Sequence, residues 1–323
     1  MGSGLFQLGD RVQLTGPKGR MSTVTLTEGG GLHTHRGVLW HSAIVGQPEG
    51  SVLTASNGDQ YLALRPLLAD YVMSMPRGAA IIYPKDAAQI LALADIRPGA
   101  TVVEAGVGSG ALSLYLLRAL GGEGRLLSFE RRPEFAEVAR GNVAGYFGEV
   151  PATWEVVLGD LAEELPARGV QADRVLLDML APWECLDAVS DALVPGGVLL
   201  CYVATVTQLS RVAEAIRATG LYTQPDSSET MVRGWHVEGL AVRPDHRMVA
   251  HTGFLITARR LAPGAVLPAP SRRASKGDFD DADVEAWTPG ALGERIKSDK
   301  RMRRVVRDAR AIAEGAGAAL DEK

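Results

Sequence analysis

The segment Val102–Gly110 (VVEAGVGSG) constrains the fold of this chain more than any other. Three glycines follow a β-branched apolar stretch, and an apolar, helix-like run, Ala111–Leu120, comes directly after them. Glycine lets the backbone bend sharply and approach a ligand, and the helix amides that follow face that ligand. The pattern therefore predicts a ligand-binding turn between a strand and a helix. The glycines alone do not name the ligand, because Gly106-x-Gly108-x-x-Ala111 also fits the looser dinucleotide fingerprint.

Strand-like and helix-like segments alternate between Thr101 and about Arg260. The strands are apolar and the helices amphipathic, which implies a mainly parallel sheet with helices on both faces. HVEGLAV (236–242) and GFLITARRL (253–261) have no long helix between them, so we expect an antiparallel pair at one sheet edge. The predicted fold class is α/β with a Rossmann-like sheet. The predicted strands are 101–106, 125–130, 154–160, 174–179 and 196–204, and the predicted helices are 111–120, 133–147, 182–193 and 206–220.

Acidic residues stand in and after the strands around this turn. Glu130 ends the next strand, where a carboxylate can accept both ribose hydroxyls of the adenosine of either NAD or S-adenosylmethionine. Asp160 ends the third strand, where it can accept the adenine amino group beside the backbone of Leu161, and Phe135 can pack on the adenine. Glu104 can meet the cationic end of methionine. An acid-lined pocket suits an ammonium and a sulfonium better than a pyrophosphate, and open α/β sheets bind ligands at these strand ends.

Each position also has an interpretation that needs no ligand. Glu130 can be a surface acid, Asp160 the N-cap of a helix, and Phe135 a core residue. Asp178 ends the fourth strand, in LDMLAPWE, next to where the methyl group of a cofactor would point. Trp183 follows within one turn and can equally be a packing residue at a helix start. The joint occurrence of the acids at successive strand ends is what favours a cofactor site.

The remaining sequence divides into three further regions. Residues 1–65 contain short β-branched stretches, one of them over 37–46, separated by glycine and proline. They predict a small all-β domain, a barrel or sandwich, with Asn57-Gly58 as a type I′ hairpin turn. Residues 66–100 predict two short helices, the second opened by Pro84, which connect to the domain at 101–262. Residues 263–323 predict a flexible linker and a basic tail, with a helix over 291–313.

The composition is that of a globular protein. Hydrophobic residues make up 46% of the 323 residues, and the net charge of −4 gives no basic surplus of the kind that marks nucleic-acid binders. No apolar run approaches the roughly 20 residues that span a bilayer, and the first residues lack a secretory pattern. Cys185 and Cys201 lack metal-ligand spacing and suit a reducing compartment. We therefore expect a cytoplasmic protein with no membrane contact and no metal.

A set of longer motifs makes the interpretation more specific. Between Leu5 and Pro263 the chain carries, in order, IIYPKDAAQI, VVEAGVGSGAL, SFERR, GDL, LDMLAPWE, YVATVTQLSR and RGWHVEGLAVRP. With these motifs the chain resembles the bacterial and archaeal tRNA (adenine-N1)-methyltransferases that modify adenosine 58 of the T-loop, the actinobacterial members most of all. DMLAPW and YPKDAA are much more specific than the glycine loop. The resemblance implies a class I methyltransferase sheet with a small N-terminal all-β domain, S-adenosyl-L-methionine as cofactor, tRNA as partner and a homotetramer.

The resemblance also implies roles for individual residues. Asp178 would lie beside both the methyl group and the target base, as the catalytic residue and as a cofactor contact. Glu104, Gly106 and Leu161 enter the cofactor set from the pattern alone. The resemblance adds or supports the remaining members of that set, which are Gln89, Ser109, Gly110, Ala111, Leu112, Glu130, Phe135 and Asp160. The resemblance further implies that the connecting segment 66–100 closes over the cofactor through Gln89 and the YPKD stretch. The tail after Pro263 lies outside the shared pattern.

The predicted reaction moves a methyl group from S-adenosylmethionine to N1 of adenosine 58 and leaves S-adenosylhomocysteine. Neutral adenine already carries a lone pair on N1, so positioning supplies much of the catalysis. Asp178 can accept a hydrogen bond from the N6 amino group as positive charge builds on the ring. The N1 edge is inaccessible in a folded T-loop, so the base must be extruded. The candidate substrate contacts, among which the sequence does not choose, are Tyr83, Trp183, Tyr202, Trp235, His236 and Arg243.

Three alternatives stay open at this point. A methyltransferase for a protein or small molecule would share the glycine loop, but it should lack DMLAPW. An NAD-dependent oxidoreductase would bind NAD and show no preference for S-adenosylhomocysteine. A non-catalytic tRNA-binding subunit would have a degenerate site, which the intact set of acids disfavours.

Overall fold

The computed structural model describes residues 4–35, 37–268 and 299–321 of the chain. Its N-terminal part consists of two small antiparallel sheets around one core, which includes the buried side chains Val12, Leu14 and Leu39. The larger sheet has the order β2-β1-β6-β5, and β3 pairs with β4. The bounds are β1 Arg11–Thr15, β2 Met21–Thr25, β3 Gly31–Thr34, β4 Gly37–Trp40, β5 Val52–Thr54 and β6 Gln60–Leu64. The predicted small all-β domain is therefore confirmed as a fold.

Two local predictions in this part are wrong. The β5–β6 turn is not type I′, because that turn needs a positive φ at two central residues and only Gly58 has one, at 86°. Instead, Gly58 donates its amide to the Ala55 carbonyl, while Asn57 and Asp59 bond to each other through their side chains. The expected strand 37–46 also stops at Trp40, where a short 3-10 helix, His41–Ala43, turns the chain.

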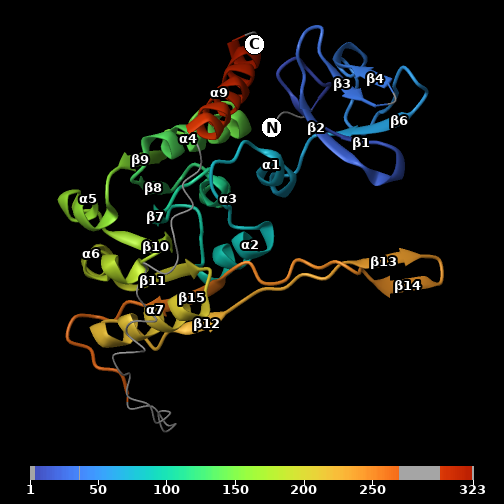
Figure 1. Cartoon of the computed structure of the whole chain (residues 1–323). Coiled ribbons are helices and arrows are strands. Elements are labelled where there is room, and N and C mark those ends of the chain that lie inside the picture. The colour runs from blue at the N-terminus through green and yellow to red at the C-terminus, as the bar shows by residue number, and fades with distance from the viewer. Residues whose placement is uncertain (1–3, 36, 269–298, 322–323) are drawn as a thin grey trace.

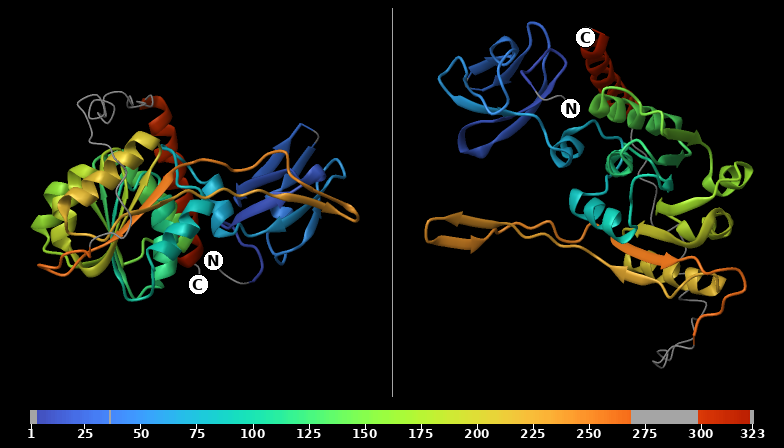
Figure 2. Two further views of the ribbon diagram at one scale, coloured as in Figure 1. Left: turned by 90° about the horizontal axis from the view of Figure 1, so that it is seen from below. Right: turned by 180° about the vertical axis from the view of Figure 1, so that it is seen from behind.

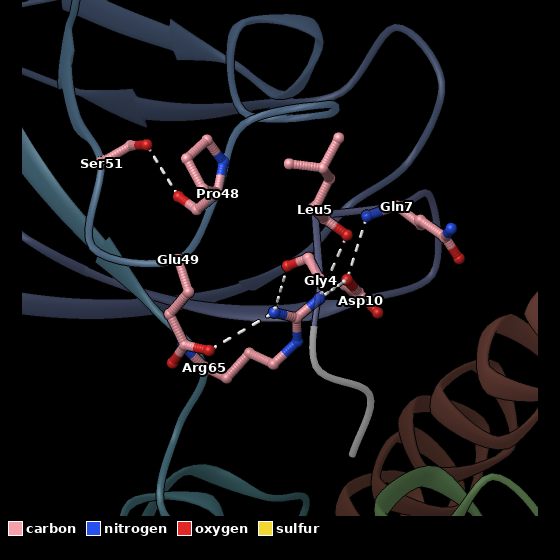
Figure 3. Close-up of polar contacts among 8 residues, drawn as sticks. All are labelled: Gly4, Leu5, Gln7, Asp10, Pro48, Glu49, Ser51 and Arg65. Atoms are coloured by element: carbon pink, nitrogen blue, oxygen red, sulfur yellow. Dashed lines mark hydrogen bonds and ion pairs between the residues drawn. The ribbon is translucent and has the colours of Figure 1, made fainter.

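Arg65 stands at the end of β6 and ties the first residues of the chain to this β structure (Figure 3). Its guanidinium contacts Asp10 at 2.7 Å and Glu49 at 3.4 Å and donates to the backbone carbonyls of Gly4 and Leu5. The Arg65 side chain is only 11% exposed, while Asp10 and Glu49 are 26% and 41% exposed, so the guanidinium lies inside the structure and its acidic partners stay open to water. These contacts connect the residues around Gly4 to the point where the chain leaves the β structure.

The central sheet has seven strands in the order β12-β15-β11-β10-β7-β8-β9. Strands β7 to β11 run parallel, and β15 is antiparallel to both of its neighbours, β11 and β12. The order reverses between β7 and β10, which makes their carboxyl ends the topological switch point where open α/β sheets bind ligands. The bounds are β7 Thr101–Ala105, β8 Arg125–Glu130, β9 Trp154–Leu158, β10 Ala172–Asp178, β11 Leu193–Val203, β12 Asp226–Ser228 and β15 Phe254–Arg259.

Helices cover both faces of this sheet (Figures 1 and 2). Adjacent strand residues such as Val102 and Val103 belong to two different cores, because successive side chains point to opposite faces. One core includes residues of α1 to α4 and the other residues of α5 to α7. The bounds are α1 Leu68–Ser74, α2 Pro84–Leu93, α3 Ala111–Leu120, α4 Pro133–Phe147, α5 Leu161–Ala167, α6 Leu186–Ala192 and α7 Val206–Thr219, with a 3-10 turn at Pro182–Cys185 before α6.

One predicted strand is misplaced. The 236–242 segment does not join the sheet; it forms a hairpin of β13 (Trp235–Glu238) and β14 (Ala241–Pro244), and β12 takes the edge position beside β15. Figures 1 and 2 show this hairpin reaching away from the catalytic sheet. Its Gly239-Leu240 turn joins the two strands, and Leu240 is fully exposed. An alternating strand pattern predicts an extended backbone but does not name its pairing partner.

The C-terminal region contains a long helix, α9 (Asp299–Asp321), which packs along α4. Most of the predicted linker, residues 269–298, lies outside the described residues. The predicted basic helix is present from residue 299 onward, but it is docked on the catalytic domain rather than held apart from it (Figure 1). Among the described residues, no helix is both long and apolar enough to cross a membrane.

Candidate active site

A deep cleft opens at the carboxyl ends of β7, β8 and β10. Its volume is about 2040 Å³, and a smaller cavity of about 190 Å³ adjoins it. A typical small-molecule site has roughly 300–1,000 Å³, so this cleft has room for more than a cofactor. Both spaces are lined by the segment 79–82, Gly106, Glu130, Arg132 and Asp178.

The glycine loop lies against the end of β10. Gly106 has a φ of 90°, and a Cβ there would lie 1.8 Å from the carbonyl oxygen of Asp178. Gly110 caps α3 with a φ of 79°, and a Cβ there would lie 3.2 Å from Ala139 on α4. Only glycine satisfies both requirements, a left-handed backbone and a close approach. The sequence therefore needs Gly106 to bring the loop and the fourth parallel strand together.

Glu130 fixes the loop from the neighbouring strand. One of its oxygens accepts the amide of Gly108 at 3.1 Å, and the other accepts the amide of Arg132 at 3.1 Å. The side chain is 5% exposed and lines both cavities, so it is not a plain surface acid. Its position suits contact with a ligand hydroxyl at the carboxyl end of β8.

Glu104 lies beneath the loop rather than on the wall of the cleft. It is fully buried, and one oxygen accepts the hydroxyls of Ser113 at 2.7 Å and Ser128 at 2.6 Å. The other oxygen is buried and has no hydrogen-bond partner among the described residues. Burial raises the pKa of this carboxyl to about 7, although the two serine hydrogen bonds oppose the shift. The expected contact with methionine is thus not visible in the lining of either cavity.

Asp178 ends β10 and faces both cavities. Burial, followed by repulsion from Glu104 and Glu130, raises the pKa of its carboxyl to about 7. A neighbouring cation would stabilise the ionised form. A carboxyl poised between its two protonation states at a strand end is typical of functional sites.

Asp160 was predicted either to contact the cofactor or to be the N-cap of a helix, and its position is compatible with both roles. Asp160 accepts the amide of Ala162 at 2.9 Å as the N-cap of α5, an element the sequence did not predict, and it still lines the cleft. Its second oxygen lies 3.5 Å from Arg131. Leu161 and Phe135 line the cleft beside it, and the Arg132 guanidinium lies 3.9 Å from the centre of the Phe135 ring.

The remaining cofactor residues divide into two groups. Ser109, Ala111 and Leu112 line the smaller cavity, and Gly110 supplies the backbone turn next to them. Gln89, by contrast, is exposed on α2 and lines neither cavity, so the structure does not support its expected closure over the cofactor. The reason is that α2 turns its buried face, Asp86, Ala87 and Ile90, inward and leaves Gln89 on the outer side.

Two of the six predicted substrate contacts line the cleft, and the other four lie elsewhere. Tyr83 and Tyr202 line the cleft. Trp183 packs instead on the second core, with Arg211 at 4.0 Å from its ring. The last three, Trp235, His236 and Arg243, lie on the exposed β13–β14 hairpin and line neither cavity.

A buried polar cluster holds Tyr202 at the cleft and was not predicted. Asp86 at the start of α2 is fully buried; it pairs with Lys85 at 2.7 Å and accepts the Thr252 hydroxyl at 2.5 Å. Gly253 makes room for Tyr202, because a Cβ there would lie 2.3 Å from the tyrosine ring. The motif YPKD thus links α2 to the segment before β15, a contact across 166 residues that no local pattern indicates.

Within residues 4–35, 37–268 and 299–321, no three or more His, Cys, Asp or Glu side chains are grouped to hold a metal ion.

Comparison with known proteins identifies the family. The model described as "tRNA methyltransferase complex GCD14 subunit" matches residues 62–240, and "TrmI-like N-terminal" matches residues 4–53. The tRNA (adenine(58)-N(1))-methyltransferase TrmI of Thermus thermophilus is 36% identical over 252 residues, which cover 75% of this chain and 94% of that protein. The chain belongs to the TrmI family of tRNA methyltransferases.

Further relatives agree with this assignment. A Methanocaldococcus jannaschii TrmI, named a tRNA (adenine(57)-N(1)/adenine(58)-N(1))-methyltransferase, is 31% identical over 65% of this chain and 82% of its own length. The crystal structure of a tRNA (m1A58) methyltransferase TrmI from Aquifex aeolicus matches with a TM-score of 0.71 at 25% identity, covering 80% of this chain and all of that one. A SAM-dependent O-methyltransferase from Thermotoga maritima matches with a TM-score of 0.75 at 28% identity, over 80% and 96% of the two chains.

Membership in the TrmI family decides between the ligands that the glycine loop left open. It assigns the class I methyltransferase fold and S-adenosylmethionine dependence, and it disfavours the dinucleotide enzyme.

The match to the catalytic family ends at residue 240. Helix α9, which begins at Asp299, therefore lies outside the matched residues.

Proposed function

We propose that this TrmI-family protein transfers the methyl group of S-adenosylmethionine to N1 of adenosine 58 in the T-loop of tRNA, with Asp178 as its catalytic residue. The observation that carries the proposal is the position of Asp178, which lies at the switch point and lines both the large cleft and the smaller cavity. Family relatives that are named for this reaction support it.

The residues present suit the cofactor. Glu130 and Asp178 are acids on the wall shared by both cavities, and buried Glu104 adds a third carboxyl close to them. Such a set favours a cationic sulfonium over a pyrophosphate. Glu130 would hold the ribose, Asp160 and Leu161 the adenine edge, and Ser109 to Leu112 the methionine end. When bound, the cofactor supplies an electrophilic methyl group.

The protein's own contribution is positioning and electrostatics. The target adenine enters the cleft as an extruded base, for which Tyr83 and Tyr202 offer aromatic faces. Ionised Asp178 accepts a hydrogen bond from the N6 amino group and holds N1 in line with the methyl group. With the cofactor bound, transfer of its methyl group would place positive charge on the adenine, and the Asp178 carboxylate would stabilise that charge. Asp178 can then take the proton that leaves N6.

Labelled S-adenosylmethionine and an unmodified tRNA transcript test this proposal. We expect label in 1-methyladenosine after digestion, and none with a transcript whose adenosine 58 is replaced by guanosine. Asp178→Ala should keep S-adenosylhomocysteine binding and lose most turnover, by about 10²–10³ in rate. Asp187→Asn, which alters an exposed acid on α6, is the matched control. Label in a protein or small molecule but not in tRNA would contradict the proposal.

We also propose that the protein is a cytoplasmic homotetramer. The β13–β14 hairpin supports self-association, since Trp235, Val237, Leu240 and Val242 are 56–104% exposed on an arm that reaches away from its own core. Apolar side chains grouped in this way mark association surfaces in soluble proteins. Light scattering during gel filtration of the full chain should give four times the 34.3 kDa of one chain, and a monomer at micromolar concentration would refute the tetramer.

A further inference from the structure

Helix α9 comes from outside the catalytic family model, yet it reaches the cleft. In Figure 1 it lies against α4 on the side of the catalytic domain that faces the N-terminal β structure. Farther along the helix, a Cβ added at Gly315 would lie 3.9 Å from the Thr25 side chain and 4.0 Å from the Cα of Gly9. The first turns of α9 line the cleft together with the start of α4. The helix therefore borders the cleft with its first turns and comes close to the N-terminal β structure farther along.

The seat for α9 is built into α4. A Cβ at Gly141 would lie 2.8 Å from the backbone of Ala309, and one at Gly145 would lie 2.0 Å from the Ile312 side chain. Ala309 is fully buried in this contact. Arg310 pairs with Glu137 one turn before Gly141. Small residues at matching positions let two helices approach closely, so α9 has one defined position rather than a general affinity for the surface.

This position turns basic side chains toward the rim of the cleft. Arg301, Arg303 and Arg307 line it and are exposed, whereas Met302 and Val306 cover its inner edge. Among the described residues, Arg301 and Arg303 form no ion pair with an acid; Arg307 lies 3.5 Å from Asp308. These guanidinium groups are thus available to an anion that approaches from solvent.

The charge of α9 differs from that of the chain as a whole. Residues 299–310 contain six Lys and Arg against two Asp, although the chain carries a net charge of −4. Arg77 and Arg131 add basic side chains to the same cleft. The floor, by contrast, holds Glu130 and Asp178. The negative charge of the floor is complementary to a cationic cofactor, and the positive charge of the rim is complementary to an incoming polyanion.

We propose that α9 is a substrate-docking element in which Arg301 and Arg303, assisted by Arg307, bind backbone phosphates of tRNA at the rim of the cleft. The inference rests on the proposed function, because it takes tRNA as the substrate. Phosphate contacts fix the register and orientation of a nucleic acid without reading its sequence. Docking by α9 would hold the tRNA while the extruded base occupies the cleft beside Asp178.

Two double variants of the full chain test this role. Arg301→Ala/Arg303→Ala removes two rim cations, and Lys300→Ala/Arg304→Ala removes two exposed cations of the same helix that do not line the cleft. Each lost phosphate contact lowers the slope of log affinity against log salt by about 0.7–0.9. The rim variant should therefore lose about 1.4–1.8 in slope and bind tRNA roughly tenfold or more weakly at 0.15 M salt. The control variant should stay close to wild type.

Three measurements separate the outcomes. Wild-type methylation of tRNA tests the proposed function, and its absence would remove both proposals. If wild type methylates tRNA but the rim and control variants bind it equally well, the role of α9 is wrong and the function stands. If the rim variant loses S-adenosylhomocysteine affinity while its tRNA affinity is unchanged, α9 is a cofactor cover and not a docking element. Circular dichroism checks folding, and Arg301→Gln/Arg303→Gln is the second variant should the alanine pair not fold.

Discussion

Replacing Glu104 by glutamine gives the sharpest quantitative test of the buried acid beneath the glycine loop. In the folded protein the pKa of Glu104 is raised from 4.5 to about 7, mainly by burial. The folded state thus keeps this proton up to about pH 7, while the unfolded chain loses it near pH 4.5. Stability falls as the pH rises between these values, and the full cost of the ionised group, about 3 kcal/mol, is present above them. Glutamine stays neutral and can still accept from Ser113 and Ser128.

The assay is urea unfolding at pH 5 and pH 8 at one protein concentration. The stability of Glu104→Gln relative to wild type should rise by about 2–3 kcal/mol between the two pH values, somewhat less than the full cost because the unfolded glutamate is already partly ionised at pH 5. Glu123→Gln, a change at an exposed glutamate between α3 and β8, is the control. An equal difference at both pH values would refute the reasoning.

A cofactor analogue extends this test to the methionine contact that was predicted for Glu104. A bound ammonium in contact with the carboxylate would favour its ionised form and lower its pKa. Saturating S-adenosylhomocysteine would then shrink the pH-dependent difference between Glu104→Gln and wild type. The burial of Glu104 away from both cavities predicts that the difference persists.

The other predictions concern catalysis, loop geometry and association. The kcat/KM of wild type should fall as the pH drops below about 7, because protonated Asp178 cannot accept from N6; in Asp178→Asn a pH-rate profile should lose this limb, with a rate about 10²–10³ lower. Gly106→Ala should abolish S-adenosylhomocysteine binding in calorimetry, whereas Gly122→Ala, at a similar φ of 84° but with open space around it, should retain it. Gly145→Leu should displace α9 and speed hydrogen exchange in that helix. Unchanged exchange in α9 would show that the helix does not pack on Gly145. Leu240→Glu should lower the mass measured by light scattering if the hairpin joins subunits.

The most accurate predictions concern helices whose ends are marked by glycine or proline. Helices α3 and α4 and strand β8 have the predicted bounds, because Gly110 and Gly121 flank α3 and Pro133 opens α4. Helix α5 is absent from the predicted elements because the predicted strand 154–160 runs through its N-cap, Asp160, although an N-cap was one of the two interpretations of that residue. A carboxylate at a strand end can do both, and sequence alone does not separate the two roles.

The site was predictable where successive strands deliver residues to one edge. Glu130, Asp160 and Asp178 follow from the parallel order of the strands, since each stands at or just after a carboxyl end. The contacts of Asp86 with Thr252 and of Glu137 with Arg310 join segments 166 and 173 residues apart. Such pairs depend on how the sheet, its covering helices and the tail pack together, which local periodicity does not encode.

The division of charge in the cleft follows from how strongly water screens each group. Exposed charges lose most of their influence beyond about 8 Å at physiological salt, so the net charge of −4 has little effect on a phosphate that lies against the α9 rim. Buried charges are screened far less, so the carboxyls of Glu104 and Glu130 add to the effect of burial in raising the pKa of Asp178, and the acidic floor favours a cation. A chain that is acidic overall can therefore present a basic entrance to tRNA and an acidic pocket to the cofactor. The entrance depends on α9 being seated on Gly141 and Gly145, because only there do its arginines reach the cleft.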